Sequence, residues 1–236
     1  IRSIQLIGSG ELSVGGIQSS ADGDHYIFGE FTSGLRVGTY EISSKGGSDL
    51  FILQWGKNGE LKNLSAVGGS SDEYFSDGLL FENYLYLTGE FEEIFSYGSK
   101  SVSSKGAKDG FVMQLPIVDP SIVNWFLGFG GSENEKVNSI CVSPKGKLFL
   151  GGSFSSSATF GPESLYSLGL QDCFVAEIDS SGNFQNLYHA GGTGMDEISS
   201  LLSIGNQLLI SGNFQNTFQW GNRKVKSKGK QDGFIA

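Results

Sequence analysis

The stretch from Gly130 to Gly191 decides the fold, and it reads GGSENEKVNSICVSPKGKLFLGGSFSSSATFGPESLYSLGLQDCFVAEIDSSGNFQNLYHAG. No window of 11 residues in it keeps the period of 3.6 residues that an amphipathic helix needs. Apolar and aromatic residues gather instead in short segments, which turn sequences rich in Gly, Ser, Asp and Pro separate. These segments predict four antiparallel strands, which we call A, B, C and D, at residues 137–142, 147–154, 174–178 and 184–190.

The same arrangement occurs four times along the chain, and three short markers reveal it. An apolar residue followed by Gly recurs after 60, 62 and 61 residues, and Gly-x-Phe and Asp-x-Phe both recur after 60, 63 and 60 residues. The markers begin at Ile7, Val67, Phe129 and Ala190, at Gly29, Gly89, Gly152 and Gly212, and at Asp49, Asp109, Asp172 and Asp232. The length differences fall chiefly at Pro116 to Pro120, where two extra residues fit a longer turn. We define repeats 1 to 4 as residues 8–67, 68–129, 130–190, and 191–236 together with 1–7.

A unit of about 61 residues with four antiparallel strands has the size of a propeller blade, and it is too long for one coil of a β-helix. The sequence therefore predicts an all-β chain in which residues 1–236 form a single domain, a four-bladed β-propeller with four strands per blade. Residues Ile1 to Ile7 match strand D, whereas the chain stops after strand C of repeat 4. We expect the N-terminal strand to close the last blade. Bulky wedges between blades are expected in two layers, at Phe31, Phe91, Phe154 and Phe214 and at Val37, Tyr97, Phe160 and Trp220.

The quoted stretch resembles the SBBP-type β-propeller repeats of bacterial secreted and cell-surface proteins. The shared features are a Gly-Gly-Ser opening, a Gly-containing turn, an Asp-x-Phe-Val-Ala strand and a Ser-Gly-Asn turn. The resemblance implies a propeller and a secreted or cell-surface location, and it implies no enzymatic activity. Repeat 1 departs most from the pattern, because it is one residue shorter after Gly8 and has Leu12 near the position where the other repeats have an acid.

Composition excludes several classes of function. The 236 residues have a net charge of −9, which disfavours binding to nucleic acid and to anionic membranes. No stretch approaches the 18 apolar residues of a membrane span, so no membrane insertion is predicted. Two His and two Cys leave little material for a metal centre, and no nucleophile elbow, phosphate-binding loop or zinc-protease motif is present. Cys141 lies on predicted strand A and Cys173 at the start of strand C, and strand B separates these two strands. Because that distance is beyond the reach of a disulfide, both cysteines are predicted to be buried thiols.

The loops that join strand D to the next strand A are the first candidate binding site. In a propeller these loops lie beside the axial mouth, where several carboxylates would bind Ca²⁺, a basic peptide or sugar hydroxyls. The alternative is a set of solvated turns on an acidic protein. Because no D-x-D-x-D-G loop is present, no metal or cofactor is predicted. The acidic residues of these loops are Glu11, Asp72, Glu73, Glu133, Glu135, Asp196 and Glu197.

Three further features have a structural and a functional interpretation. The repeated aspartates could form a ring of carboxylates, but repetition favours a structural role in which each accepts backbone N–H bonds where strand C begins. Trp125 takes a strand D position that is polar in the other repeats, so we expect it on the outer rim, where it would stack on a sugar or a partner. The alternating cations Lys224, Lys226, Lys228 and Lys230 suit a polyanion contact, but protection of an exposed sheet edge is favoured.

Together these features predict a non-catalytic extracellular recognition or adhesion module that binds a glycan or protein through its propeller loops. The alternative is a structural spacer or assembly unit of a larger surface or fibre protein, in contact with further domains or with other copies. A glycan-cleaving enzyme ranks last. Paired carboxylates alone can cleave sugars, but nothing in the sequence places two of them together.

Overall fold

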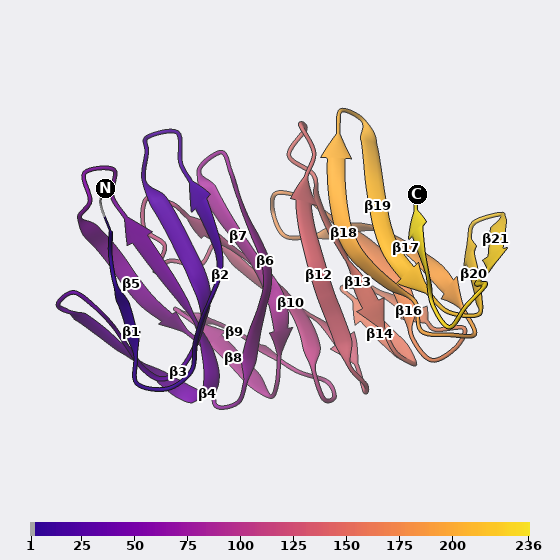
Figure 1. Cartoon of the computed structure of the whole chain (residues 1–236), viewed down its shortest axis with the longest axis horizontal. Coiled ribbons are helices and arrows are strands. Elements are labelled where there is room, and N and C mark those ends of the chain that lie inside the picture. The colour runs from indigo at the N-terminus through magenta and orange to yellow at the C-terminus, as the bar shows by residue number, and fades with distance from the viewer. Residues whose placement is uncertain (1–2) are drawn as a thin grey trace. The chain divides into compact units, whose positions relative to one another are not determined.

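The computed structural model describes residues 3–236 and contains only β-strands and the loops between them (Figure 1). In that part of the chain no helix is found that could cross a membrane. The chain divides into two compact units, Ile1–Ser103 with Val112–Phe126 and Ser104–Phe111 with Leu127–Ala236. Residues 1 and 2, which belong to the predicted N-terminal strand, lie outside the described residues.

The strands fall at the positions that the repeats predict. The strands in the A positions are β2 (Leu12–Ser19), β6 (Glu73–Phe81), β12 (Glu135–Val142) and β18 (Glu197–Ile204). Those in the B positions are β3 (His25–Val37), β7 (Tyr84–Phe91), β13 (Leu148–Phe154) and β19 (Gln207–Phe214). Those in the C positions are β4 (Tyr40–Trp55), β10 (Asp109–Pro116), β16 (Asp172–Ile178) and β22 (Asp232–Ile235). Those in the D positions are β1 (Leu6–Gly8), β5 (Leu61–Val67), β11 (Trp125–Gly131) and β17 (Phe184–Gly192).

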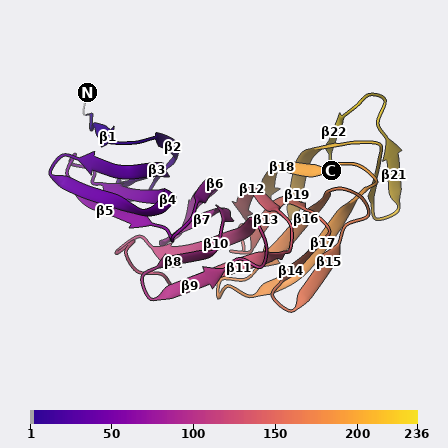
Figure 2. The same ribbon diagram turned by 90° about the horizontal axis from the view of Figure 1, so that it is seen from below.

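Each repeat folds as an antiparallel meander in which neighbours in sequence are neighbours in the sheet. Strand β3 pairs with β2 on one side and β4 on the other, and β4 pairs in turn with β5 (Figure 2). The order β12-β13-β16-β17 repeats this arrangement. In repeat 4 the meander comprises β18, β19 and β22, in that order. All these strand pairings are antiparallel, so the prediction of an all-β chain is confirmed.

A hairpin projects between the B and C strands of every repeat. It comprises β8 (Ile94–Tyr97) with β9 (Lys100–Ser103), β14 (Ser157–Phe160) with β15 (Glu163–Tyr166), and β20 (Thr217–Trp220) with β21 (Arg223–Lys226). In repeat 1 the hairpin is continuous with β3 and β4. The end of the preceding D strand pairs with the hairpin: β1 with β3, β11 with β14, and β17 with β20. The hairpins therefore link one repeat to the next within each unit.

The two ends of the chain lie in different units. Strand β1 pairs with β3 through residues Leu6 to Gly8, and β22 pairs with β19. Within residues 3–236 the only sheet neighbour of β22 is β19. Pairing of the N-terminal strand with β22, which the sequence predicts, is therefore not among the strand pairs of the described residues.

The predicted wedge residues lie in the core. Phe31, Phe91, Phe154 and Phe214 are all buried, with no more than 4 % of any side chain exposed. In the second layer Val37, Tyr97 and Phe160 are buried and Trp220 is half-buried. In unit 2 the rings of Phe129, Phe160 and Phe174 stack and tilt against one another at centroid distances of 4.7 to 5.8 Å. Aromatic burial of this kind is a large part of the free energy that holds each sheet pair together.

The glycine pairs that open repeats 2, 3 and 4 allow close backbone approach. A Cβ added at Gly192 would lie 1.6 Å from the carbonyl oxygen of Thr217, and one added at Gly131 would lie 1.8 Å from that of Ser157. Both carbonyls belong to the hairpin of the repeat that the glycine pair opens. No side chain fits there without moving the hairpin away from the strand.

We expect Gly192→Ala to lower the free energy of unfolding by ~1–2 kcal/mol, because the methyl group must displace backbone atoms. The matched control is Gly229→Ala, whose added Cβ meets nothing closer than an oxygen of Asp232 at 4.0 Å. Chemical denaturation of both variants measures the difference. Equal stability of the two variants would refute the close-approach argument.

Candidate functional site

An open pocket of about 710 Å³ lies in unit 1. The turns that join the A and B strands of repeats 1 and 2 form two of its walls, and the loop at residues 116–120 forms a third. Polar side chains dominate its lining. The residues around it are Ser20, Asp22, Asp24, Tyr26, Gln54, Lys62, Asn63, Asn83, Tyr84 and Pro116 to Pro120. We call it the polar pocket.

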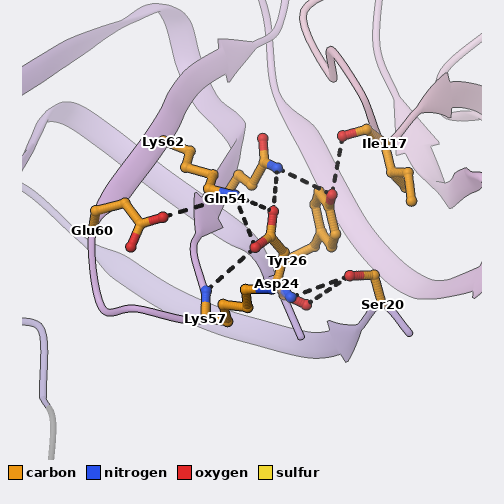
Figure 3. A network of polar contacts seen from close by, with 8 residues as sticks. All are labelled: Ser20, Asp24, Tyr26, Gln54, Lys57, Glu60, Lys62 and Ile117. Atoms are coloured by element: carbon orange, nitrogen blue, oxygen red, sulfur yellow. Dashed lines mark hydrogen bonds and ion pairs between the residues drawn. The ribbon is translucent and has the colours of Figure 1, made fainter. Parts of the chain in front are cut away.

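A buried carboxylate fixes one wall of the polar pocket (Figure 3). Asp24 is 9 % exposed and accepts hydrogen bonds from Lys62 Nζ at 2.8 and 2.9 Å. It accepts two more, from Gln54 Nε2 at 3.0 Å and from the backbone N–H of Lys57 at 3.3 Å. The backbone N–H of Asp24 donates to Ser20 Oγ at 3.2 Å. A carboxylate with this many donors is held in one orientation.

The same network positions a buried phenol. Tyr26 is 1 % exposed; its hydroxyl accepts a bond from Gln54 Nε2 at 3.1 Å and donates to the carbonyl oxygen of Ile117 at 3.0 Å (Figure 3). The backbone N–H of Ile117 donates to the carbonyl oxygen of Asn83 at 2.9 Å. Tyr97 anchors the far end of the loop by donating to the carbonyl oxygen of Pro120 at 2.9 Å. The extra residues of repeat 2 therefore form a rigid wall of the pocket.

The charges of this network are fixed near neutral pH. The hydrogen bond from Lys62 is the largest cause that holds the pKa of Asp24 below its ordinary value, and bonds from Gln54 and Lys57 add to it. Burial raises the pKa of Tyr26 to about 12. Neither group exchanges a proton near neutrality, so the network holds geometry rather than transferring protons.

The polar pocket breaks the repetition of the scaffold. In repeat 3 the positions of Asp24 and Gln54 are taken by Lys147 and Glu177, which form their own ion pair at 2.6 Å. The corresponding hollow in unit 2 is smaller, about 300 Å³, and lies between the A–B turns of repeats 3 and 4. Because scaffold positions repeat while function is usually asymmetric, this one enlarged hollow is the best candidate site.

Three of the acidic residues predicted to bind a ligand are buried. Glu73, Glu135 and Asp196 are 0 %, 1 % and 0 % exposed, and we call them the junction carboxyls. Each accepts a backbone N–H, from Gly69 at 2.9 Å, Gly131 at 2.7 Å and Gln215 at 3.1 Å. Glu73 and Glu135 close the loops in which they occur, and Asp196 connects its loop to the segment after β19. The three buried side chains are not available to a ligand in this structure.

The repeated aspartates have the structural role that the sequence predicts. Each accepts the backbone N–H of the residue four positions earlier, at 2.8 to 3.1 Å. Asp49, Asp109 and Asp172 are buried and stand close to the junction carboxyl of the following repeat. In each of these three aspartates and three junction carboxyls one oxygen has no hydrogen-bond partner. For the junction carboxyls, burial with an unsatisfied oxygen disfavours the charged form.

Burial accordingly raises the pKa of the junction carboxyls. The pKa of Glu73 and that of Glu135 rise to about 8, and the pKa of Asp196 rises to about 6. The charge of the neighbouring strand C aspartate adds to each shift. The pKa of Asp109 also rises to about 6, mainly through burial.

The other four predicted acids do not form one cluster. Asp72 accepts the Ser48 N–H at 2.7 Å, and Glu197 forms an ion pair with Lys136 at 2.7 Å. Glu11 and Glu133 are exposed, each in a different unit. Among residues 3–236 no group of three or more His, Cys, Asp and Glu side chains could hold a metal ion.

The prediction that Trp125 lies on the outer rim is wrong. Its side chain is only 9 % exposed, and its ring lies 5.9 Å from that of Tyr86. Counting from the glycine pair misplaces it by one residue. Asn124 makes the polar contact of that position, donating to Gln114 Oε1 at 2.9 Å as Asn186 donates to Glu177 in repeat 3. Trp125 is a core residue.

Both cysteines are free and buried, which confirms the sequence prediction. Burial raises the pKa of Cys173 far above its ordinary value. We expect neither thiol to react with Ellman's reagent in the native protein and both to react in 6 M guanidinium chloride, because the thiolate is the reactive form. Rapid titration of one thiol under native conditions would contradict this placement.

The sequence does not reveal the polar pocket, because its residues come from five separate segments of the chain. The two extra residues near Pro116 are the one available signal, since an insertion in a single repeat marks asymmetry. Comparisons with known proteins add no assignment: no family model and no curated protein matches the chain.

Proposed function

We propose that the chain is a non-catalytic recognition module that binds a neutral glycan in the polar pocket. The observation that supports this most is the network of Asp24, Gln54, Tyr26 and Lys62, which holds polar groups rigidly along one wall of a 710 Å³ hollow (Figure 3). Preorganised polar groups bind a ligand without the entropic cost of ordering them first.

The chemistry of the lining favours a hydroxyl-rich ligand. Pockets for apolar molecules are lined mainly by hydrophobic side chains, with few polar groups. Here carboxylate, amide and hydroxyl groups supply both donors and acceptors, as a sugar requires. Asp22 and Asn83 are exposed at the rim, and Tyr84 presents a half-buried aromatic ring on which a sugar could stack.

The proton chemistry of the described residues favours binding over catalysis. A glycan-cleaving enzyme needs a carboxylic acid with a raised pKa within reach of the substrate. The carboxyls whose pKa rises to about 8 are Glu73 and Glu135, and both are buried in the repeat junctions. The carboxylate in the polar pocket, Asp24, has a lowered pKa and is ion-paired.

A glycan array followed by isothermal titration calorimetry tests this function. The wild-type protein should bind at least one neutral oligosaccharide, and Asp22→Ala with Tyr84→Ala should weaken that binding at least tenfold. Tyr40→Ala, at a ring 45 % exposed outside the pocket, is the matched control and should bind normally. Absence of binding to the whole array, or equal loss in the control, would reject the proposal.

We also infer that the four repeats close as a four-bladed propeller and that the chain is exported, as the resemblance to SBBP-type repeats implies. The supporting features are the strand meander that recurs along the chain and the pairing of D strands with the hairpin that follows them. Small-angle scattering tests closure: a compact chain of this length should have a radius of gyration of about 17–18 Å. A value well above this range would indicate an open array.

An assembly unit is the second candidate function, and one patch in repeat 3 favours it. Tyr166, Leu168 and Leu170 are 71 %, 64 % and 66 % exposed. The same positions are Ser, Lys and Gly in repeat 1 and Ser, Lys and Ala in repeat 2. Because the row is apolar along its length, it is self-complementary, and a twofold dimer is the commonest assembly of such a surface. Sedimentation velocity would show dimers that Leu168→Lys abolishes; a monomer at all concentrations would reject this function.

A further inference from the structure

The hairpin of repeat 4 is a concentrated positive segment on an acidic protein. Its five cations are all exposed, and among the residues described none of them forms an ion pair with an acid. Removing five positive charges from a chain of net charge −9 leaves −14, so the rest of the molecule is strongly acidic. We call this set the basic hairpin: Arg223, Lys224, Lys226, Lys228 and Lys230.

The scaffold explains only one of these cations. Lys228 occupies the position of Lys45 and Lys105, whose Nζ atoms donate to the carbonyl oxygens of Gly68 at 3.2 Å and Gly130 at 3.5 Å. At each of the other four positions, no residue type is shared by all three remaining repeats. Repeat 1 has Tyr40, Glu41, Ser43 and Gly47, repeat 2 has Lys100, Ser101, Ser103 and Ala107, and repeat 3 has Glu163, Ser164, Tyr166 and Leu170.

Protection of a sheet edge does not account for the whole set. Strand β21 is the edge strand of its sheet, and lysines there discourage pairing with another chain. Strand β15 occupies the same edge position in repeat 3, and it contains no Lys or Arg. Moreover, Lys228 and Lys230 lie beyond the end of β21. More positive charge is present than an edge of this fold requires.

Two of the cations lie side by side on one strand, and two more follow it closely in sequence. Alternate residues of a strand point to the same side and are about 6.6–6.8 Å apart, so Lys224 and Lys226 lie side by side on one face of β21. Lys228 and Lys230 follow in the bend after the strand, so the positive charge extends beyond β21. Several mobile ammonium groups spread along one segment match a linear chain of anionic groups better than they match one small anion.

We propose that the basic hairpin binds an acidic polysaccharide, a linear sugar chain with spaced carboxylate or sulfate groups. Nucleic acid carries a phosphate at every nucleotide, so a bound strand would extend its dense negative charge over the acidic remainder of the protein. A polysaccharide with sparser charges meets less of this repulsion. This site is in unit 2 and does not depend on the polar pocket of unit 1.

Fluorescence anisotropy with labelled hyaluronate and labelled κ-carrageenan, linear chains with one carboxylate or one sulfate per disaccharide, tests the proposal. At 50 mM NaCl the wild-type protein should bind at least one of them, and binding should weaken steeply with added salt. The triple variant Lys224→Gln, Lys226→Gln, Lys230→Gln should bind at least tenfold more weakly, with a shallower salt dependence. Neutral dextran should not bind. The two probes distinguish carboxylate from sulfate recognition.

The matched control removes the same charge elsewhere. The triple variant Arg36→Gln, Lys100→Gln, Lys145→Gln changes three exposed cations outside the basic hairpin and should bind as the wild type does. Equal weakening in both variants would show that only net charge matters and would overturn the proposal. So would absence of binding to both acidic probes, or tighter binding of a single-stranded oligonucleotide of equal charge.

Discussion

Lowering the pH from 8 to 5 is expected to stabilise the protein against unfolding. The junction carboxyls Glu73 and Glu135 have pKa values of about 8 in the folded protein, against the ordinary glutamate pKa of 4.5 in the unfolded chain. Their burial favours the neutral acid, so the folded state binds protons that the unfolded state has released.

The sign of the effect follows from proton linkage. Because the pKa of Glu73 and that of Glu135 are raised in the folded state, each carboxyl adds to the free energy of unfolding. This contribution is complete below pH 4.5 and is lost as the pH rises towards 8. Within that window each group changes the free energy of unfolding by up to about 1.4 kcal/mol per pH unit. Asp24 acts in the opposite direction, but its lowered pKa confines its effect to pH values below about 4.

The double variant Glu73→Gln, Glu135→Gln isolates this effect, because Gln has the shape of the neutral acid and does not ionise. Denaturant unfolding between pH 5 and 8 should show a much flatter pH dependence than the wild type, and the variant should be the more stable protein at pH 8. Glu41→Gln with Glu163→Gln changes two exposed acids and is the control. A wild-type stability that rises between pH 5 and 8 would contradict the burial argument.

Asp24→Asn is expected to lower the free energy of unfolding by ~2–3 kcal/mol. The substitution keeps the shape of the side chain but removes the charge that Lys62 and Gln54 contact at 2.8 to 3.0 Å. It also places an NH₂ group among donors, so buried hydrogen bonds are lost. Lys62 is 38 % exposed and can turn to water, which keeps the loss below that of a fully buried ion pair.

Urea denaturation of single and double variants measures this contribution. Asp22→Asn, at an exposed neighbour, should change stability by less than about 0.5 kcal/mol. In a double-mutant cycle Asp24→Asn and Lys62→Met should show a coupling free energy of about 1 kcal/mol or more. Additive effects would mean that the ion pair does not organise the pocket wall. The same Asp24→Asn protein should lose glycan binding if the network preorganises the site.

The strands and their boundaries could be predicted from the sequence, because period, turn chemistry and the glycine pairs all repeat. Phe31, Phe91 and Phe154 are correctly assigned to the core, since a large aromatic in every repeat indicates burial. The role of the repeated aspartates follows from the same argument. Trp125 is misplaced because one irregular strand shifts the alignment by a residue, and one residue reverses the face of a strand.

The sites were harder to predict, because they depend on what differs between repeats. The acidic loops share a composition, yet Glu73, Glu135 and Asp196 are buried by the backbone that folds over them. No local pattern distinguishes a buried loop carboxylate from a solvated one. The polar pocket brings together residues up to 100 positions apart, from Ser20 to Pro120, and only tertiary structure shows that they share a wall.

Mapping a bound glycan onto the ¹⁵N-labelled protein tests the central claim most directly. Titration with the neutral oligosaccharide that binds most tightly on the array should shift the backbone amide resonances of Asp22, Asn63, Asn83, Tyr84 and residues 117–119 of the loop. Amide shifts confined to the loops of Glu11 and Glu133, or no shifts at all, would place recognition elsewhere and contradict the account.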